Sequence, residues 1–233
     1  MASNRRTPTN RTPRRERAAP PRTAVAAPSS RAGVAGRKAR GAGRREDILA
    51  AALAEFSASG FEAARLDDVA KRAKVAKGTI YLYFRDKESL FQELIRDMLM
   101  PIIGTIEMLG AVKMPLAQLA DRLVDVFVRE VYETPRKDIV RLMITEGRRF
   151  PKIAEFYYRE VLSHIMNAIR AILHRAAARG EVPASLVDFP QILVAPGLVA
   201  ILWSGLFDRF EPLDVRAMMK THVDLLLASR KVP

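Results

Sequence analysis

Residues 66–84 have the sequence LDDVAKRAKVAKGTIYLYF, and this stretch decides the fold. It reads as a short helix, a tight turn and a second short helix. Val69 and Ala73 give the first helix a small packing face, Val75 fills the corner, and Ile80 anchors the second helix from the other side. Because small residues allow two helices to cross closely, the stretch predicts a helix-turn-helix.

The outward side of the second helix carries polar groups suited to DNA. With Ile80 turned inward, that side presents Lys77, Thr79, Tyr81 and Tyr83. Its N-terminal end, Lys77-Gly78-Thr79, offers the short or flexible groups that reach base edges in the major groove. Residues 71–87 also hold many more basic than acidic side chains. The pattern predicts a recognition helix, although the two tyrosines could instead pack the corner between helices.

Residues 48–91 resemble the DNA-binding domain of the TetR (tetracycline-repressor-like) family of bacterial regulators. The resemblance is carried by Val69-Ala70, Ala73, Val75, Lys77-Gly78-Thr79-Ile80-Tyr81, Tyr83-Phe84, Lys87 and Leu90. It implies an obligate homodimer on double-stranded operator DNA, with Tyr81 and Lys87 holding phosphates and Thr79 among the base-reading positions. Lys87 follows Asp86, which can cap the next helix and place the ammonium near a helix N-terminus.

Three positions depart from the family pattern. Arg65 stands where Thr or Ser usually caps the second helix, but it can bind phosphate more strongly. Lys74 puts a Cβ in a turn that often favours glycine, and Tyr83 replaces the more usual His. The DNA-facing residues are expected to be Arg45, Arg65, Lys77, Gly78, Thr79, Tyr81, Tyr83 and Lys87.

The net charge of +13 belongs mainly to the beginning of the chain. Residues 1–45 hold thirteen of the 39 basic side chains and one of the 26 acidic ones, so the rest is nearly neutral. Residues 1–43 have almost no aliphatic side chains and are expected to form a disordered basic arm, either inert or clamping phosphates. We expect a DNA-binding domain over residues 44–90 and a ligand-sensing and dimerisation domain over 91–233.

Composition and motifs also argue against several classes of protein. The chain has no cysteine, which fits a reducing cytoplasm. It shows no catalytic constellation, no glycine-rich phosphate loop and no cluster of metal ligands, so neither an enzyme nor a cofactor is expected. The apolar run Ile192–Phe207 is shorter than a membrane span and is interrupted by Pro196 and Gly197. We expect a cytoplasmic protein in which a subunit interface covers this run.

Apolar residues recur with the period of an α-helix, and no strand pattern of useful length is present. The predicted fold is all-α with about nine helices: 44–59, 66–73, 77–83, 87–109, 115–132, 137–149, 152–179, 188–207 and 212–229. Proline and glycine mark the boundaries, for example Gly60 after the first helix.

The helices after the DNA-binding domain are rich in large apolar side chains. Most such residues form the core of a bundle, but the resemblance gives reason to expect a ligand cavity among them. The polar residues among them indicate where a ligand could bind, although Glu146 could instead pair with Arg149 or Arg141. The expected pocket residues are Met98, Ile102, Leu123, Phe127, Met143, Glu146, Tyr157, Val161, His164 and Trp203.

The last two predicted helices carry surfaces too apolar for solvent, and the family uses such helices to dimerise. The expected interface residues are Ala200, Trp203, Ser204, Phe207, Met218, Met219, His222 and Leu226. Taken together, these features predict a homodimeric repressor that an unidentified small molecule releases from its operator. The alternative is an architectural, nucleoid-type DNA-binding protein without ligand control.

Overall fold

A computed structural model describes the backbone of residues 30–228 and the side chains of residues 43–228. Every regular element in this part of the chain is helical, which confirms the predicted all-α class. Residues 1–29 of the expected arm lie outside the described residues. The first helix, α1 (Ser30–Ala63), begins at Ser30 rather than at residue 44. The structure thus has helix over residues 30–43, a part of the chain that was expected to belong to the disordered arm.

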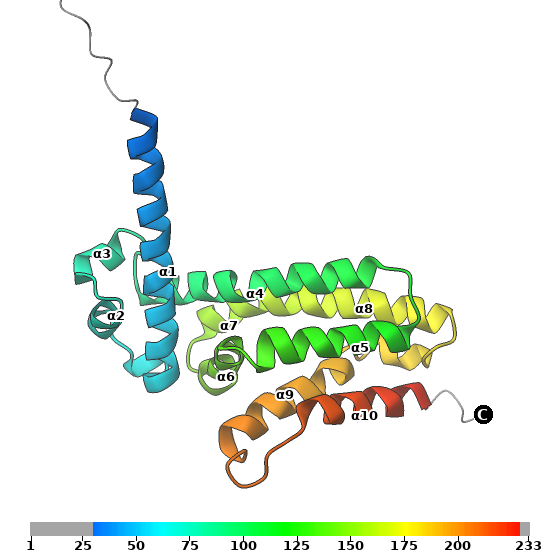
Figure 1. Ribbon diagram of the computed structural model, residues 1–233. Helices are drawn as coiled ribbons and strands as arrows, with labels where there is room; N and C mark the ends of the chain where they lie inside the picture. Colours follow the sequence, from blue (N-terminus) through cyan, green and yellow to red (C-terminus); the bar gives the residue numbers. More distant parts are fainter. Residues whose placement is uncertain (1–29, 229–233) are drawn as a thin grey trace, which may run out of the picture. The chain divides into compact units, whose positions relative to one another are not determined.

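The helix-turn-helix follows directly after α1. Helix α2 (Leu66–Arg72) and helix α3 (Lys77–Tyr81) lie beside α1 (Figure 1). Lys74 in the turn has a φ of 53°, so it adopts the left-handed conformation that favours glycine, as the sequence predicted. Gly60 interrupts α1 with a φ of 75°, which confirms the expected break there.

The helices after the turn form the body of the molecule. They are α4 (Lys87–Ala111), α5 (Leu116–Val126), α6 (Arg136–Glu146), α7 (Pro151–Tyr157), α8 (Ser163–Ala178), α9 (Gln191–Leu206) and α10 (Val215–Ala228), with a short turn η3 (Ala184–Val187) before α9. Helices α4, α5 and α8 run side by side, and α10 packs against α5 and α9 (Figure 1). Among the described residues, no helix has both the length and the apolar character that crossing a membrane requires.

Two wider turns interrupt this bundle. Helix α5 continues into the π-helical turn η1 (Phe127–Tyr132), and α7 runs through a second π-helical turn, η2 (Tyr158–Leu162), into α8. Residues 151–178 thus form the one long helix expected over 152–179. Such turns are rare and are frequently found at functional sites, and the extra residue changes the direction in which side chains point.

One apolar core joins the DNA-binding helices to the bundle. Phe56 of α1, Phe91 of α4 and Ile139 of α6 belong to the same buried cluster. The ring of Phe61 lies 5.1 Å from that of Phe91 and 4.7 Å from that of Phe150, measured between centroids. Because closely packed interiors transmit strain, this shared core is a mechanical connection between the bundle and α1.

Candidate nucleic-acid interface and ligand cavity

A buried ion pair fixes α2 against α1. The carboxylate of Glu55 is buried and accepts hydrogen bonds from Arg72 Nε at 3.2 Å, from the Arg72 terminal nitrogen at 3.1 Å and from Ser59 Oγ at 3.0 Å. A buried carboxylate is tolerated only when it is paired and hydrogen-bonded, as here. Arg72 therefore stabilises the packing of α2 against α1. In the sequence it is only one of several basic residues around this motif.

Helix α3 presents its polar side to the exterior, as the sequence predicted. Ile80 is fully buried, Thr79 is half-buried, and Gly78 is exposed with open space around it. The side chain of Tyr81 is 50% exposed, and that of Tyr83 is also exposed. Neither ring is buried in the corner between helices, the alternative considered for both.

The cations around α3 differ in how they are held. Lys77 Nζ lies 2.8 Å from an Asp67 oxygen, and this hydrogen bond raises the pKa of Lys77. Arg65 precedes α2 without capping it through its side chain, as expected from its replacing Ser or Thr. Arg65 and Lys74 are exposed and form no ion pair within the described part of the chain. Lys74 belongs to the basic residues counted over 71–87, but it was not among the expected DNA-facing residues.

Lys87 is placed differently from the expectation. Its ammonium donates to the carbonyl oxygens of Phe61, Glu62 and Ala64 at 2.7, 2.8 and 3.0 Å. These three bonds use all three N–H groups, so Lys87 caps the C-terminal end of α1. Burial lowers the pKa of Lys87, against the opposing effect of Glu62 and Glu146. Asp86, as predicted, caps α4 by accepting from the Ser89 main-chain N–H at 2.7 Å.

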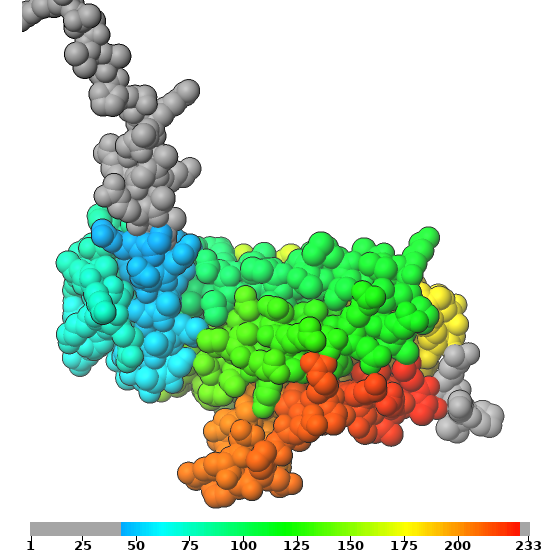
Figure 2. All heavy atoms as spheres, in the orientation of Figure 1, coloured from blue at the N-terminus to red at the C-terminus, as the bar shows by residue number. Residues whose placement is uncertain are grey.

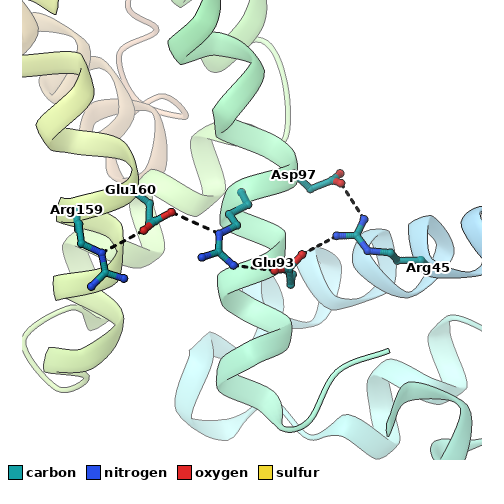
Figure 3. A network of polar contacts seen from close by, with 6 residues as sticks. Arg45, Glu93, Asp97, Arg159 and Glu160 are labelled. Carbon is teal, nitrogen blue, oxygen red and sulfur yellow. Dashed lines mark hydrogen bonds and ion pairs between the residues drawn. The ribbon is translucent and has the colours of Figure 1, made fainter. Parts of the chain in front are cut away.

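Arg45 also turns inward. It pairs with Glu93 at 2.9 Å and with Asp97 at 3.0 Å, both on α4. Arg96 bridges Glu93 at 2.9 Å and Glu160 of η2 at 3.6 Å (Figure 3). Burial raises the pKa of Glu93, but the hydrogen bonds from Arg96 and Arg45 lower it by more, so the pKa lies below its usual value. The network connects α1, α4 and η2.

A cavity of about 220 Å³ lies between α4, α5, α8, α9 and α10. Both π-helical turns contribute to its wall, η1 through Phe127 and Val131 and η2 through Val161 and Leu162. Of the expected pocket residues, those that line it are Ile102, Leu123, Phe127, Tyr157 and Val161. An apolar cavity between helices is a usual site for a small ligand.

The other five expected pocket residues lie elsewhere. Met98 and Met143 pack against the core shared by the DNA-binding helices and the bundle. Glu146 faces Gly60, and the exposed His164 lies 3.8 Å from Glu107. The indole N–H of Trp203 donates to the Glu211 carbonyl at 2.7 Å. The expectation was wrong for these five because helical periodicity gives the face of a residue but not the neighbour it meets. Conversely, His222 lines the cavity, although it was expected at the interface.

The expected interface residues fall into two groups, those buried within the chain and those at least partly exposed. Ala200 and Met219 are buried within the chain, against Val124 and Val128, so they cannot form a subunit contact. Phe207 is exposed, and Trp203, Ser204, Met218, His222 and Leu226 are half-buried. The end of α9 stands out from the body (Figure 2). The exposed apolar side chains on α9 and α10, mostly missed by sequence reasoning, are Ile192, Leu198, Val199, Leu202, Leu206 and Leu225.

Comparisons with known proteins agree with this architecture. Residues 48–94 match the model of the bacterial regulatory proteins of the tetR family, and residues 116–225 match that of the tetracyclin repressor-like C-terminal domain. The HTH-type transcriptional regulator AcrR of Shigella flexneri is 26% identical over 188 residues, which are 78% of this chain and 87% of AcrR. YdgC of Bacillus subtilis, an uncharacterized HTH-type transcriptional regulator, is 42% identical over 60 residues, but these are 26% of this chain and 31% of YdgC.

Solved structures share the fold. FadR from Bacillus subtilis, solved in complex with stearoyl-CoA, superposes with a TM-score of 0.64 at 22% identity, over 78% of this chain and 97% of FadR. SmeT, the repressor of a Stenotrophomonas maltophilia multidrug efflux pump, has a TM-score of 0.64 at 18% identity, over 79% of this chain and 89% of SmeT.

Proposed function

Because this chain belongs to the TetR family of bacterial regulatory proteins, we propose that it is a transcriptional repressor that a small molecule releases from its operator DNA. The observation that carries the proposal is the outward face of α3. It exposes Gly78 and Tyr81 beside Lys77, on a helix that the buried Ile80 holds in place. This is the arrangement that a recognition helix needs in the major groove.

The DNA contacts that we propose exclude Lys87 and Arg45. Thr79 and Gly78 would approach base edges, and Tyr81 and Lys77 would hold phosphates, with Lys77 exchanging its Asp67 partner for a phosphate. Arg65 and Lys74 add exposed positive charge next to α3. Phosphate contacts position the protein and base contacts give it sequence preference. The basic residues before α1 could add affinity for any DNA sequence.

We further propose that the protein acts as a homodimer through α9 and α10. Leu198, Val199 and Leu202 project from α9, and Leu206 at its end is 61% exposed. A contiguous apolar surface of this kind marks an interaction site in a protein that meets water. A two-fold axis here would pair two copies of α3, which suits an operator with two half-sites about 34–36 Å apart. Such a repressor would act in the cytoplasm and without enzymatic activity.

Ligand control requires a connection from the cavity to α3. Val161 lines the cavity, its neighbour Glu160 pairs with Arg96 of α4, and Glu93 on the same helix pairs with Arg45 of α1. A ligand that pushed η2 outward would pull on this network and tilt α4. Stabilisation of the tilted state by the ligand would separate the recognition helices from their half-sites. The small-molecule complex of FadR supports a ligand in this fold.

The test is selection of DNA by the full-length protein from a random pool, followed by titration of the selected sequence. We expect a two-fold symmetric motif, which Thr79→Ala should read less strictly. Thr105→Ala, on the exposed side of α4 away from the motif, is the matched control and should select the same DNA. Failure to enrich any motif would instead support an architectural DNA-binding protein and overturn the repressor proposal.

A further inference from the structure

The wall of the cavity is made almost entirely of hydrocarbon. Among the described residues that line it there is no Asp, Glu, Lys or Arg, and the two with polar side-chain atoms are Tyr157 and His222. Glu146, the carboxylate that the sequence placed in the pocket, lies outside the wall. The cavity thus offers a charged group no permanently charged side chain as a counter-ion and no cluster of hydrogen-bonding side chains. Burying an unpaired charge in such surroundings is strongly unfavourable, because the charge loses its hydration.

The two polar side chains have different capacities for a ligand. His222 Nε2 donates to the Ile192 carbonyl oxygen at 2.9 Å, so this nitrogen is already engaged. The hydroxyl of Tyr157 makes no hydrogen bond within the part of the chain that the structure describes. Burial raises the pKa of Tyr157 to about 12, so the hydroxyl remains a neutral donor and acceptor. The Tyr157 side chain is half-buried and belongs to the cavity wall, so a ligand in the cavity can give its hydroxyl a hydrogen-bond partner.

The volume of the cavity also limits the size of a ligand. The volume of about 220 Å³ lies below the roughly 300–1,000 Å³ of pockets for drug-sized ligands. The cavity therefore suits a single alkyl chain or a small ring system. The wall is tightly packed at Gly197, since a Cβ there would lie 3.0 Å from the ring of Phe127.

From this lining we propose that the cavity binds a compact, uncharged, apolar molecule with a single hydrogen-bonding group, which pairs with the Tyr157 hydroxyl. The proposal rests on the proposed function only where this molecule is taken to control DNA binding. The selectivity itself follows from the wall: an apolar body gains by leaving water, a neutral head group pairs with Tyr157, and a charged head group finds no permanently charged side chain to offset the loss of its hydration.

Three ligands with the same alkyl chain and different head groups test the proposal by calorimetric titration into the full-length protein. They are 1-decanol, decanoate and decyltrimethylammonium. We expect 1-decanol to bind at least tenfold more tightly than either charged ligand. Tyr157→Phe should weaken 1-decanol about two- to tenfold, the loss of one hydrogen bond. Tyr158→Phe is the matched control: its side chain is 60% exposed and outside the cavity wall, so affinity should not change.

Equal or tighter binding of decanoate or decyltrimethylammonium would overturn the proposal, and so would the absence of 1-decanol binding. An unchanged affinity in Tyr157→Phe would overturn the role of Tyr157 as the anchor. A separate titration of the ligand-free protein on its selected DNA tests the proposed function independently of ligand binding. Loss of DNA selectivity with intact 1-decanol binding would contradict the repressor alone, and the reverse would contradict the ligand class alone.

Discussion

The ammonium nitrogen of Lys87 lies 2.7 Å from the main-chain carbonyl oxygen of Phe61, across the junction between the start of α4 and the end of α1. The same ammonium lies 4.8 Å from the centre of the Phe61 ring. The last carbonyls of a helix have no partner within it, and a cation placed there satisfies them and the helix dipole. Lys87 thus holds together the two segments that a ligand signal must cross.

Removal of this cap should cost stability. We expect Lys87→Met to lower the free energy of unfolding by about 1–3 kcal/mol, because three carbonyls lose a charged donor. Denaturation in urea measures the change. Lys71→Met is the control, since Lys71 is exposed and pairs only with Asp68 one turn away, and should change stability by less than about 0.5 kcal/mol. A Lys87→Met protein of unchanged stability with weakened DNA binding would restore the phosphate role expected from the sequence.

Gly60 should not tolerate a side chain. Its φ of 75° and ψ of 166° are accessible almost only to glycine, and an added Cβ would lie 2.9 Å from Glu146 Oε1. Gly60→Ala should therefore lower the free energy of unfolding by about 1–3 kcal/mol, which thermal denaturation would show as a lower melting temperature. Gly104→Ala, inside α4 with open space around it, should raise stability by roughly 0.5–1 kcal/mol. Equal effects of the two substitutions would contradict the geometry at Gly60.

Stability should depend on pH through Asp86. The hydrogen bond from the Ser89 main chain, together with Arg85, lowers the pKa of Asp86 below its ordinary value of 3.8. A carboxyl with a lowered folded-state pKa stabilises the protein above about pH 4, and this contribution is lost as the pH falls through the folded-state value. Unfolding between pH 5 and pH 2 should therefore show a smaller loss of stability in Asp86→Asn, whose amide oxygen can still cap α4. Parallel curves for the two proteins would argue against this cap.

The ion-pair network should carry the ligand signal. Arg96→Ala disconnects Glu160 from Glu93 without touching α3 or the cavity wall. We expect ligand-free Arg96→Ala to bind operator DNA within about threefold of the natural protein, while the ligand-induced loss of affinity shrinks several-fold. Arg170→Ala is the control, since Arg170 is exposed and bonds only to Asn167 on its own helix. An undiminished ligand response in Arg96→Ala would exclude the network as the connection.

The sequence predicted the elements of the fold better than the partners of individual side chains. Ile80 and Asp86 lie as predicted because local patterns, a buried helical face and a cap, determine them. Sequence patterns did not predict the surroundings of Lys87 and Glu146, because Phe61 and Gly60, which lie against them, come from another part of the chain. The π-helical turns that shape the cavity leave no mark in the apolar periodicity, since they are set by packing between helices.

Sequence-specific DNA binding is the centre of this account, and one titration tests it most directly. The full-length protein is titrated on the DNA upstream of its own gene and on a scrambled duplex of the same composition, at several salt concentrations. Specific recognition by α3 predicts an affinity at least a thousandfold higher for the upstream DNA. Salt should weaken both complexes, because phosphate contacts contribute to each. Equal affinities for the two duplexes at every salt concentration would contradict the account.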